Sequence, residues 1–145
     1  MPPTDPYTAI PQLLYRYGEA IDQGRLEDAA AMFRHARIHT GRSQPLNADE
    51  LLALWQRILV IYPCGTLRTR HLITNPIIEL DADGTRASCR SCYTVLQATE
   101  QLPLQVIVSG RYHDQFALID GEWCFTERDY RQMDLVGELS AHLKK

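Results

Sequence analysis

The chain changes from helical to extended patterning at residues 67–80, which read LRTRHLITNPIIEL. Three more extended segments follow, at residues 85–99, 104–119 and 122–131. Turn sequences separate them, and Asp120-Gly121 is a strong hairpin signal. Pro76 interrupts the first segment and predicts an edge or a bulge there, because proline cannot donate a ladder hydrogen bond. The second half therefore predicts an antiparallel meander.

The first half has the periodicity of amphipathic helices. The first helix is expected to end at Gly24, because glycine tolerates the backbone conformation that terminates helices. Asn47 and Glu50 form a capping-box pattern at the start of another helix that runs to about Tyr62. The remaining expected elements are a short helix at 25–33, a strand at 34–40 and a terminal helix at 134–143.

Helices gathered before the strands favour an α+β fold over a βαβ fold. A chain of 145 residues is a usual size for one domain. We predict a single domain over residues 1–145, a cone-shaped α+β barrel with three N-terminal helices packed on a strongly curved, mainly antiparallel sheet. Such a cone holds a pocket with mainly apolar walls and a few convergent polar groups.

Charge and hydropathy limit the classes of binding partner that are expected. The net charge is −3 and the basic residues are scattered, which argues against nucleic acid. No apolar run approaches the roughly 20 residues of a membrane span. The N-terminal sequence lacks the basic and apolar regions of a signal peptide, so a cytoplasmic location is expected. A small molecule is the expected partner.

Asp22 and His71 are the candidate catalytic residues, one at the end of the first helix and one on the first strand. A carboxylate can orient an imidazole, which then serves as a general base near neutral pH. Strand register gives His71 a common face with Thr69, Ile73 and Asn75. The alternatives are a solvated helix end for Asp22 and a core histidine bonded to a backbone carbonyl for His71.

Five further residues are candidate substrate contacts. Tyr15 and Tyr17 are candidate polar groups inside an apolar pocket, because a buried phenol needs a hydrogen-bond partner, and either could bind a developing oxyanion. Trp55 occupies a position that lines either the cone interior or plain core. Asn75 and Tyr93 complete the set.

Cofactors and metals are not expected. Cys89 and Cys92 have the spacing of a metal-binding pair, but residues three apart on a strand point to opposite faces. The chain has no second cysteine pair to complete a zinc site. It also lacks a phosphate loop, a dinucleotide fingerprint and a nucleophile elbow. Proton transfer in a dry pocket needs no cofactor.

Two segments carry a resemblance to a known family. Ile21-Asp22-Gln23-Gly24-Arg25-Leu26 and Leu67-Arg68-Thr69-Arg70-His71 resemble the scytalone dehydratase-like branch of the SnoaL-like proteins, within the nuclear transport factor 2-like superfamily. The resemblance implies that Asp22 orients His71 in a cofactor-independent dehydratase or isomerase acting on a small, mostly apolar, ring-containing compound. Hexachlorocyclohexane dehydrochlorinase is similar. Ile21 departs from the dehydratases, which have a tyrosine there.

The segment from Arg68 to Asn75 reads Arg-x-Arg-His-x-x-x-Asn and also resembles the beta subunits of ring-hydroxylating dioxygenases. Those subunits share the fold and serve a structural role beside a catalytic partner. The alternative function is therefore a non-catalytic subunit or a ligand-binding module. The resemblance further implies a homodimer or homotrimer.

Overall fold

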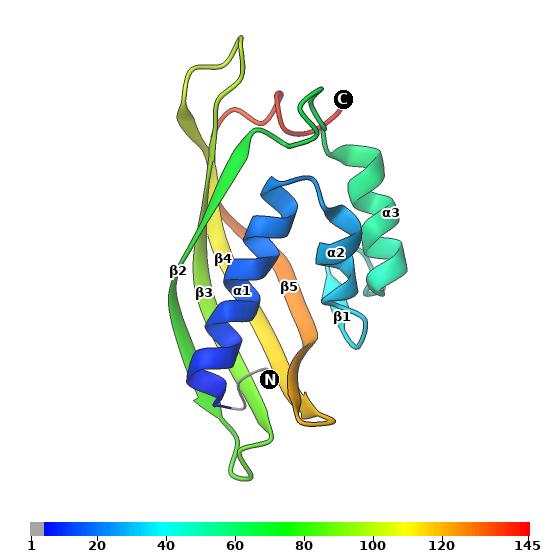
Figure 1. The fold of residues 1–145 in the computed structure, drawn as a ribbon, viewed down its shortest axis with the longest axis vertical. Helices are drawn as coiled ribbons and strands as arrows, with labels where there is room; N and C mark the ends of the chain where they lie inside the picture. Colours follow the sequence, from blue (N-terminus) through cyan, green and yellow to red (C-terminus); the bar gives the residue numbers. More distant parts are fainter. Residues whose placement is uncertain (1–4) are drawn as a thin grey trace.

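The computed structural model describes residues 5–145 (Figure 1). The first four residues of the expected domain lie outside this range. The described residues form three helices and five strands. In chain order they are α1 (Pro6–Asp22), α2 (Leu26–Ala31), β1 (Arg37–His39), α3 (Ala48–Ile58), β2 (Thr69–Leu80), β3 (Arg86–Gln97), β4 (Gln105–Ile119) and β5 (Glu122–Val136).

The strands form one sheet in the order β1-β5-β4-β3-β2. Strands β2 to β5 are an antiparallel meander, and β1 joins β5 in parallel. Figure 1 shows α1 lying across the sheet, while α2 and α3 lie next to β1. The sheet is mixed and does not close on itself. The predicted α+β cone is confirmed.

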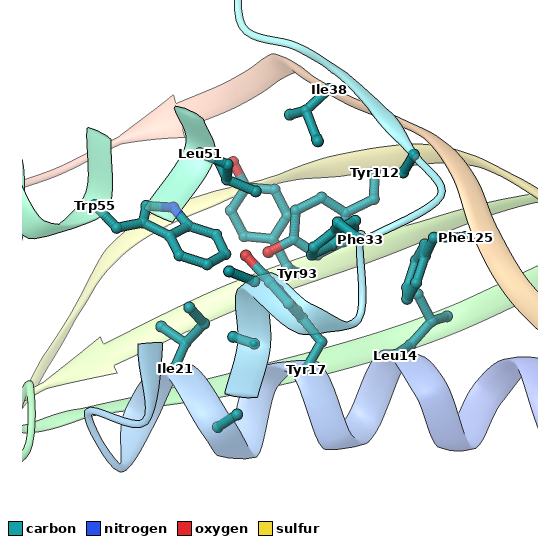
Figure 2. Close-up of a cluster of buried hydrophobic side chains, with 14 of the residues drawn as sticks. Leu14, Tyr17, Ile21, Phe33, Ile38, Leu51, Trp55, Tyr93, Tyr112 and Phe125 are labelled. Carbon is teal, nitrogen blue, oxygen red and sulfur yellow. The ribbon is translucent and has the colours of Figure 1, made fainter. Parts of the chain in front are cut away.

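The core lies between α1 and the inner face of the sheet. Ile10, Leu14, Tyr17 and Ile21 recur at helical spacing and are all buried. On β3 the buried side chains alternate with more exposed ones, as expected for a strand with one covered face. The helix therefore presents its apolar stripe to the alternating inner residues of the strands (Figure 2).

The end of α1 is fixed against the loop that leads into β2. Gly24 has a φ of +75°, a conformation that favours glycine, and a Cβ there would collide with the carbonyl oxygen of Gly65. The backbone N–H of Leu67 donates to the carbonyl of Asp22 at 3.3 Å. This close approach places the last turn of α1 beside the first residues of β2.

The C-terminal region differs from the expectation. The predicted terminal helix over 134–143 is wrong, because β5 continues to Val136 and pairs Leu135 with Ser109 on β4. Pairing with a neighbouring strand outweighs local propensity there. The α3 helix also ends at Ile58, short of the expected end. Among the described residues no helix is both long and apolar enough to cross a membrane.

Candidate active site

The structure brings Asp22 and His71 together. Asp22 is the last residue of α1 and His71 the third residue of β2. One carboxylate oxygen lies 2.6 Å from His71 Nδ1, and the other accepts the backbone N–H of His71 at 2.7 Å. Their side chains are only 11% and 7% exposed. The carboxylate therefore holds both the ring and the backbone of the histidine.

Thr69 adds a third donor to this carboxylate. Its hydroxyl donates to Asp22 Oδ1 at 2.8 Å. With Nδ1–H directed at the carboxylate, a neutral imidazole has its lone pair on Nε2. None of the hydrogen bonds within residues 5–145 uses Nε2 of His71. The arrangement leaves one basic nitrogen available for a proton.

Gly18 lets α1 approach β2 this closely. It precedes Asp22 by four residues and so lies on the same side of the helix. A Cβ at Gly18 would lie 3.2 Å from both Cβ of His71 and Cδ1 of Ile73, tighter than most packing contacts. A glycine in a helix interior is otherwise unfavourable. Its position was therefore a usable sequence signal, which our sequence interpretation missed.

Tyr17 lies inside the cone beside the pair. Its ring meets the His71 ring edge-on, with centroids 6.4 Å apart, and its hydroxyl lies 2.7 Å from that of Tyr130. Burial raises the pKa of Tyr17 well above its ordinary value, and the neighbouring Tyr112 raises it further. Tyr17 is therefore a neutral phenol, able to donate a hydrogen bond.

Two other predicted contacts join this aromatic cluster. Figure 2 shows Trp55 from α3 and Tyr17 from α1 pointing toward the same centre. Their ring centroids are 6.3 Å apart. Tyr93 stacks on Tyr112 with centroids 4.4 Å apart. Aromatic faces thus fill the interior next to His71.

Tyr15 and Asn75 do not belong to the buried aromatic cluster. Tyr15 is 49% exposed, so the prediction of a buried phenol is wrong for it. It lies on the helix face that carries Asp22 and helps to line a surface pocket of about 500 Å³, which also includes Asp22 and His71.

Asn75 has a φ of +55° and is exposed. Its predicted common face with His71 is wrong, because the strand register shifts between Thr74 and Ile77. The bulge predicted at Pro76 is confirmed by the same shift.

A buried ion pair was missed at the sequence level. Arg128 on β5 and Asp114 on β4 are both fully buried, and two guanidinium nitrogens donate to the two carboxylate oxygens at 2.5 and 3.1 Å. Burial raises the pKa of Asp114, and the adjacent guanidinium opposes that rise. Five aromatic rings surround the guanidinium, namely Tyr17, Phe33, Tyr112, Phe125 and Tyr130. The alternation of Tyr112, Asp114 and Phe116 along one strand face was the available signal.

His142 was also missed. Its carbonyl accepts the backbone N–H of Val60 at 2.9 Å, which fixes it within the C-terminal segment. Burial, reinforced by the charge of His71 and opposed by that of Asp22, lowers its pKa from 6.5 to about 4. The ring is therefore neutral at pH 7. The sequence held no signal for this position, because it lies where a helix was expected.

The surface pocket beside the pair is not the largest one. A pocket of about 750 Å³ lies between Tyr62, Leu102 and Ala141, and neither Asp22 nor His71 lines it. We place the candidate site at the smaller pocket, because it contains both members of the pair. Across residues 5–145 no group of three or more histidine, cysteine, aspartate or glutamate side chains is arranged to hold a metal ion.

A helix-covered curved sheet with a buried acid–base pair defines a class of α+β cone proteins that bind or transform small molecules. Residues 4–129 match the SnoaL-like domain family, and the chain belongs to that family. Its fold is the cystatin-like fold of nuclear transport factor 2-like proteins. Among curated proteins, none matches the sequence significantly.

Solved structures agree with this assignment. An Asp-to-Asn variant of Rv3472, a protein of unknown function from Mycobacterium tuberculosis, is 26% identical with a TM-score of 0.67, covering 88% of this chain and 71% of that one. A candidate scytalone dehydratase from Novosphingobium aromaticivorans is 20% identical, with a TM-score of 0.66 and coverage of 92% and 93%. The beta subunit of a candidate aromatic-ring-hydroxylating dioxygenase from the same organism is 21% identical, with a TM-score of 0.64 and coverage of 93% and 94%. The last two likenesses show the fold alone.

Proposed function

We propose that the protein is a cofactor-independent lyase or isomerase that acts on a small, mostly apolar, ring-containing compound. His71 is the general base and Asp22 is the residue that orients it. The observation that carries the proposal is the 2.6 Å contact between Asp22 and His71 Nδ1, which leaves Nε2 as the basic nitrogen.

The proposed reaction begins with transfer of a proton from a carbon next to a carbonyl to Nε2 of His71. The electron pair of the broken C–H bond moves into an enolate, and the new imidazolium is stabilised by the Asp22 carboxylate. In a lyase the enolate then expels a group from the neighbouring carbon. In an isomerase another carbon takes the proton back. The neutral phenol of Tyr17, at the edge of the His71 ring, would donate to the enolate oxygen.

The surroundings of the pair favour an apolar ring as substrate. Tyr17, Trp55 and Tyr93 present aromatic faces within the cone, where offset or edge-on ring contacts are favourable. Tyr15 lines the surface pocket of about 500 Å³ together with Asp22 and His71. Asn75 is not included in the proposed site, since it lies four residues along the strand from His71, roughly 13 Å at the usual rise.

Replacement of Asp22 by Asn tests the proposal. A direct assay is dehydration of 3-hydroxycyclohexanone, in which loss of water gives a conjugated enone that absorbs in the ultraviolet. The Asn side chain cannot stabilise the imidazolium, and it favours the wrong tautomer of His71, so we expect turnover to fall at least about tenfold. Exchange of the protons next to the carbonyl in D2O, followed by NMR, measures the first step alone.

Asp28→Asn is the matched control, because it makes the same chemical change at a carboxylate that is 64% exposed on α2. It should leave turnover unchanged. Equal rates in wild type and Asp22→Asn, or neither exchange nor enone formation by the wild type, would rule out a general-base role on this substrate class.

The second candidate function is a binding or subunit role. Large apolar side chains are exposed where β4 begins and β5 ends, with Leu104 71%, Leu135 68% and Val136 59% exposed. Val108 pairs with Val136, so these strand ends are neighbours. The patch would be covered in a homodimer or homotrimer, or by a larger catalytic chain. Measurement of the molar mass in solution, alone and after co-purification, separates these assemblies.

A further inference from the structure

The buried Asp114–Arg128 pair is connected to the proposed site through two phenols. Nη1 of Arg128 donates to the hydroxyl of Tyr130 at 3.3 Å, and that hydroxyl lies 2.7 Å from the hydroxyl of Tyr17. The other guanidinium nitrogens, Nε and Nη2, donate to Asp114. The ring of Tyr17 lies edge-on to the ring of His71. A continuous series of contacts therefore joins a fully buried charge pair to the proposed general base.

The hydrogen bond between the two phenols has two possible directions, because a hydroxyl both donates and accepts. A guanidinium can only donate, so the oxygen of Tyr130 accepts from Arg128. Accepting from a cation polarises the phenol, which strengthens Tyr130 as a donor and weakens its oxygen as an acceptor for a second proton. The favoured direction therefore has Tyr130 donating to the oxygen of Tyr17.

In this arrangement the proton of Tyr17 cannot lie between the two phenols. It points toward the middle of the aromatic cluster, where the Tyr17 side chain has Trp55 and Tyr112 as neighbours (Figure 2). Burial raises the pKa of Tyr17 well above its ordinary value, and contact with Tyr112 adds to the rise, so the proton is retained at pH 7. A substrate oxygen bound there would replace Tyr112 as the group that faces this proton.

We propose that Tyr130, with Arg128 behind it, is a positioning residue for the reaction at His71, which rests on the function proposed above. It holds the oxygen of Tyr17 as an acceptor, and the Tyr17 proton is thereby directed toward the enolate oxygen. A donor that is already oriented needs no reorganisation when negative charge develops on that oxygen. Tyr130 transfers no proton itself and acts only through Tyr17.

The direction of the hydrogen bond can be tested without a substrate. Neutron diffraction from a crystal of the deuterium-exchanged full chain shows the hydroxyl deuterons directly. We expect the deuteron of Tyr130 to lie between the two phenol oxygens and that of Tyr17 to point away from Tyr130. The reverse direction, with Tyr17 donating to Tyr130, would overturn the proposal.

Kinetics with 3-hydroxycyclohexanone test the consequence for the reaction. Tyr130→Phe removes the hydroxyl and keeps the ring, and Arg128 retains both of its bonds to Asp114. We expect kcat to fall about tenfold with KM nearly unchanged, because the lost orientation matters in the transition state. Tyr17→Phe should lower kcat about a hundredfold. Adding Tyr130→Phe to Tyr17→Phe should lower kcat no further, because Tyr130 acts only through Tyr17.

Tyr62→Phe is the matched control. Its hydroxyl donates to the carbonyl of Ala141 at 2.5 Å, in a pocket that contains neither Asp22 nor His71, so kcat should not change. An unchanged kcat in Tyr130→Phe, or a further fall when it is added to Tyr17→Phe, would overturn the positioning role. Absence of turnover in the wild type would overturn the proposed reaction, and the deuteron positions would then decide alone whether Tyr130 orients Tyr17.

Discussion

The cone contains two buried acid–base pairs that differ in one respect. In Asp114–Arg128 both partners are fully buried, and the guanidinium bonds to both carboxylate oxygens and to the hydroxyl of Tyr130. In Asp22–His71 the carboxylate is equally well supplied with donors, but one ring nitrogen has no partner among the described residues.

This difference suits the Asp114–Arg128 pair to a structural role and the Asp22–His71 pair to proton transfer. The fully buried Asp114–Arg128 pair has no side open to a substrate, because aromatic rings cover the guanidinium, with the Tyr112 ring only 3.7 Å away. The Asp22–His71 pair is open on one side, so it can accept a proton. Tyr17 contacts both, with its ring 4.6 Å from the Arg128 guanidinium and edge-on to His71. The Asp114–Arg128 pair thereby helps to position the groups around the open one.

The largest expected effect is on stability, from Arg128→Met. This change leaves the Asp114 carboxylate buried without a partner, which typically costs about 3–5 kcal/mol of the free energy of unfolding. Urea unfolding at pH 7 measures it. Adding Asp114→Leu to the same chain should recover much of the loss, because an apolar pair replaces the orphaned charge.

The exposed pair Arg111–Asp134 is the control for that experiment. It has the same two-fold hydrogen bonding, at 2.8 and 3.0 Å, but its side chains are 49% and 41% exposed. Solvent screens such pairs, so Arg111→Met should leave stability nearly unchanged. Similar losses for the two arginine variants would show that burial does not distinguish the pairs.

A smaller effect on the free energy of unfolding is expected from a change of pH, through the buried His142. Folding lowers the pKa of His142 from 6.5 to about 4, so the unfolded chain binds a proton more readily. The contribution of His142 to stability is therefore complete above pH 6.5 and is lost as the pH falls toward 4. Between pH 7 and pH 5 the expected loss is about 2 kcal/mol.

Many groups contribute to the pH dependence of the whole chain, so the informative quantity is the difference in stability between wild type and His142→Leu. The variant should lose less stability between pH 7 and pH 5 in the same urea experiment. Identical pH dependence in the two chains would mean that His142 is not held as a buried neutral ring.

The candidate pair was predictable because each residue lies at the boundary of an element that the local sequence marks. Asp22 is the last residue of a helix that stops just before Gly24, and His71 lies near the start of a strand with alternating burial. These features depend on neighbours in the sequence. The helix end and the strand start lie side by side because Gly24 permits a close approach to Gly65, and Gly18 to His71 and Ile73. These approaches depend on the space between elements and were not predicted from the sequence.

Other errors came from long-range effects. Alternation placed Asn75 beside His71, but a shift in register beyond Thr74 turned it to solvent. The terminal segment was expected to be helical, but its first residues pair with β4 instead. The segment that carries His142 then crosses back to Ile58 and Val60. Local propensity contains no information about such pairing.

The smallest expected effect comes from Thr69→Val, which removes one of the three donors to Asp22 and keeps the shape of the side chain. We expect a loss of about 1 kcal/mol in stability and a decrease in turnover of about threefold to tenfold. The loss is limited because Asp22 still contacts Nδ1 and accepts the backbone N–H of His71. Thr94→Val is the control, since its hydroxyl lies 3.0 Å from that of Ser109 and makes no contact with the pair. A decrease in turnover as large as that of Asp22→Asn would mean that the carboxylate depends on Thr69 for its position, and the open pair would then be a triad.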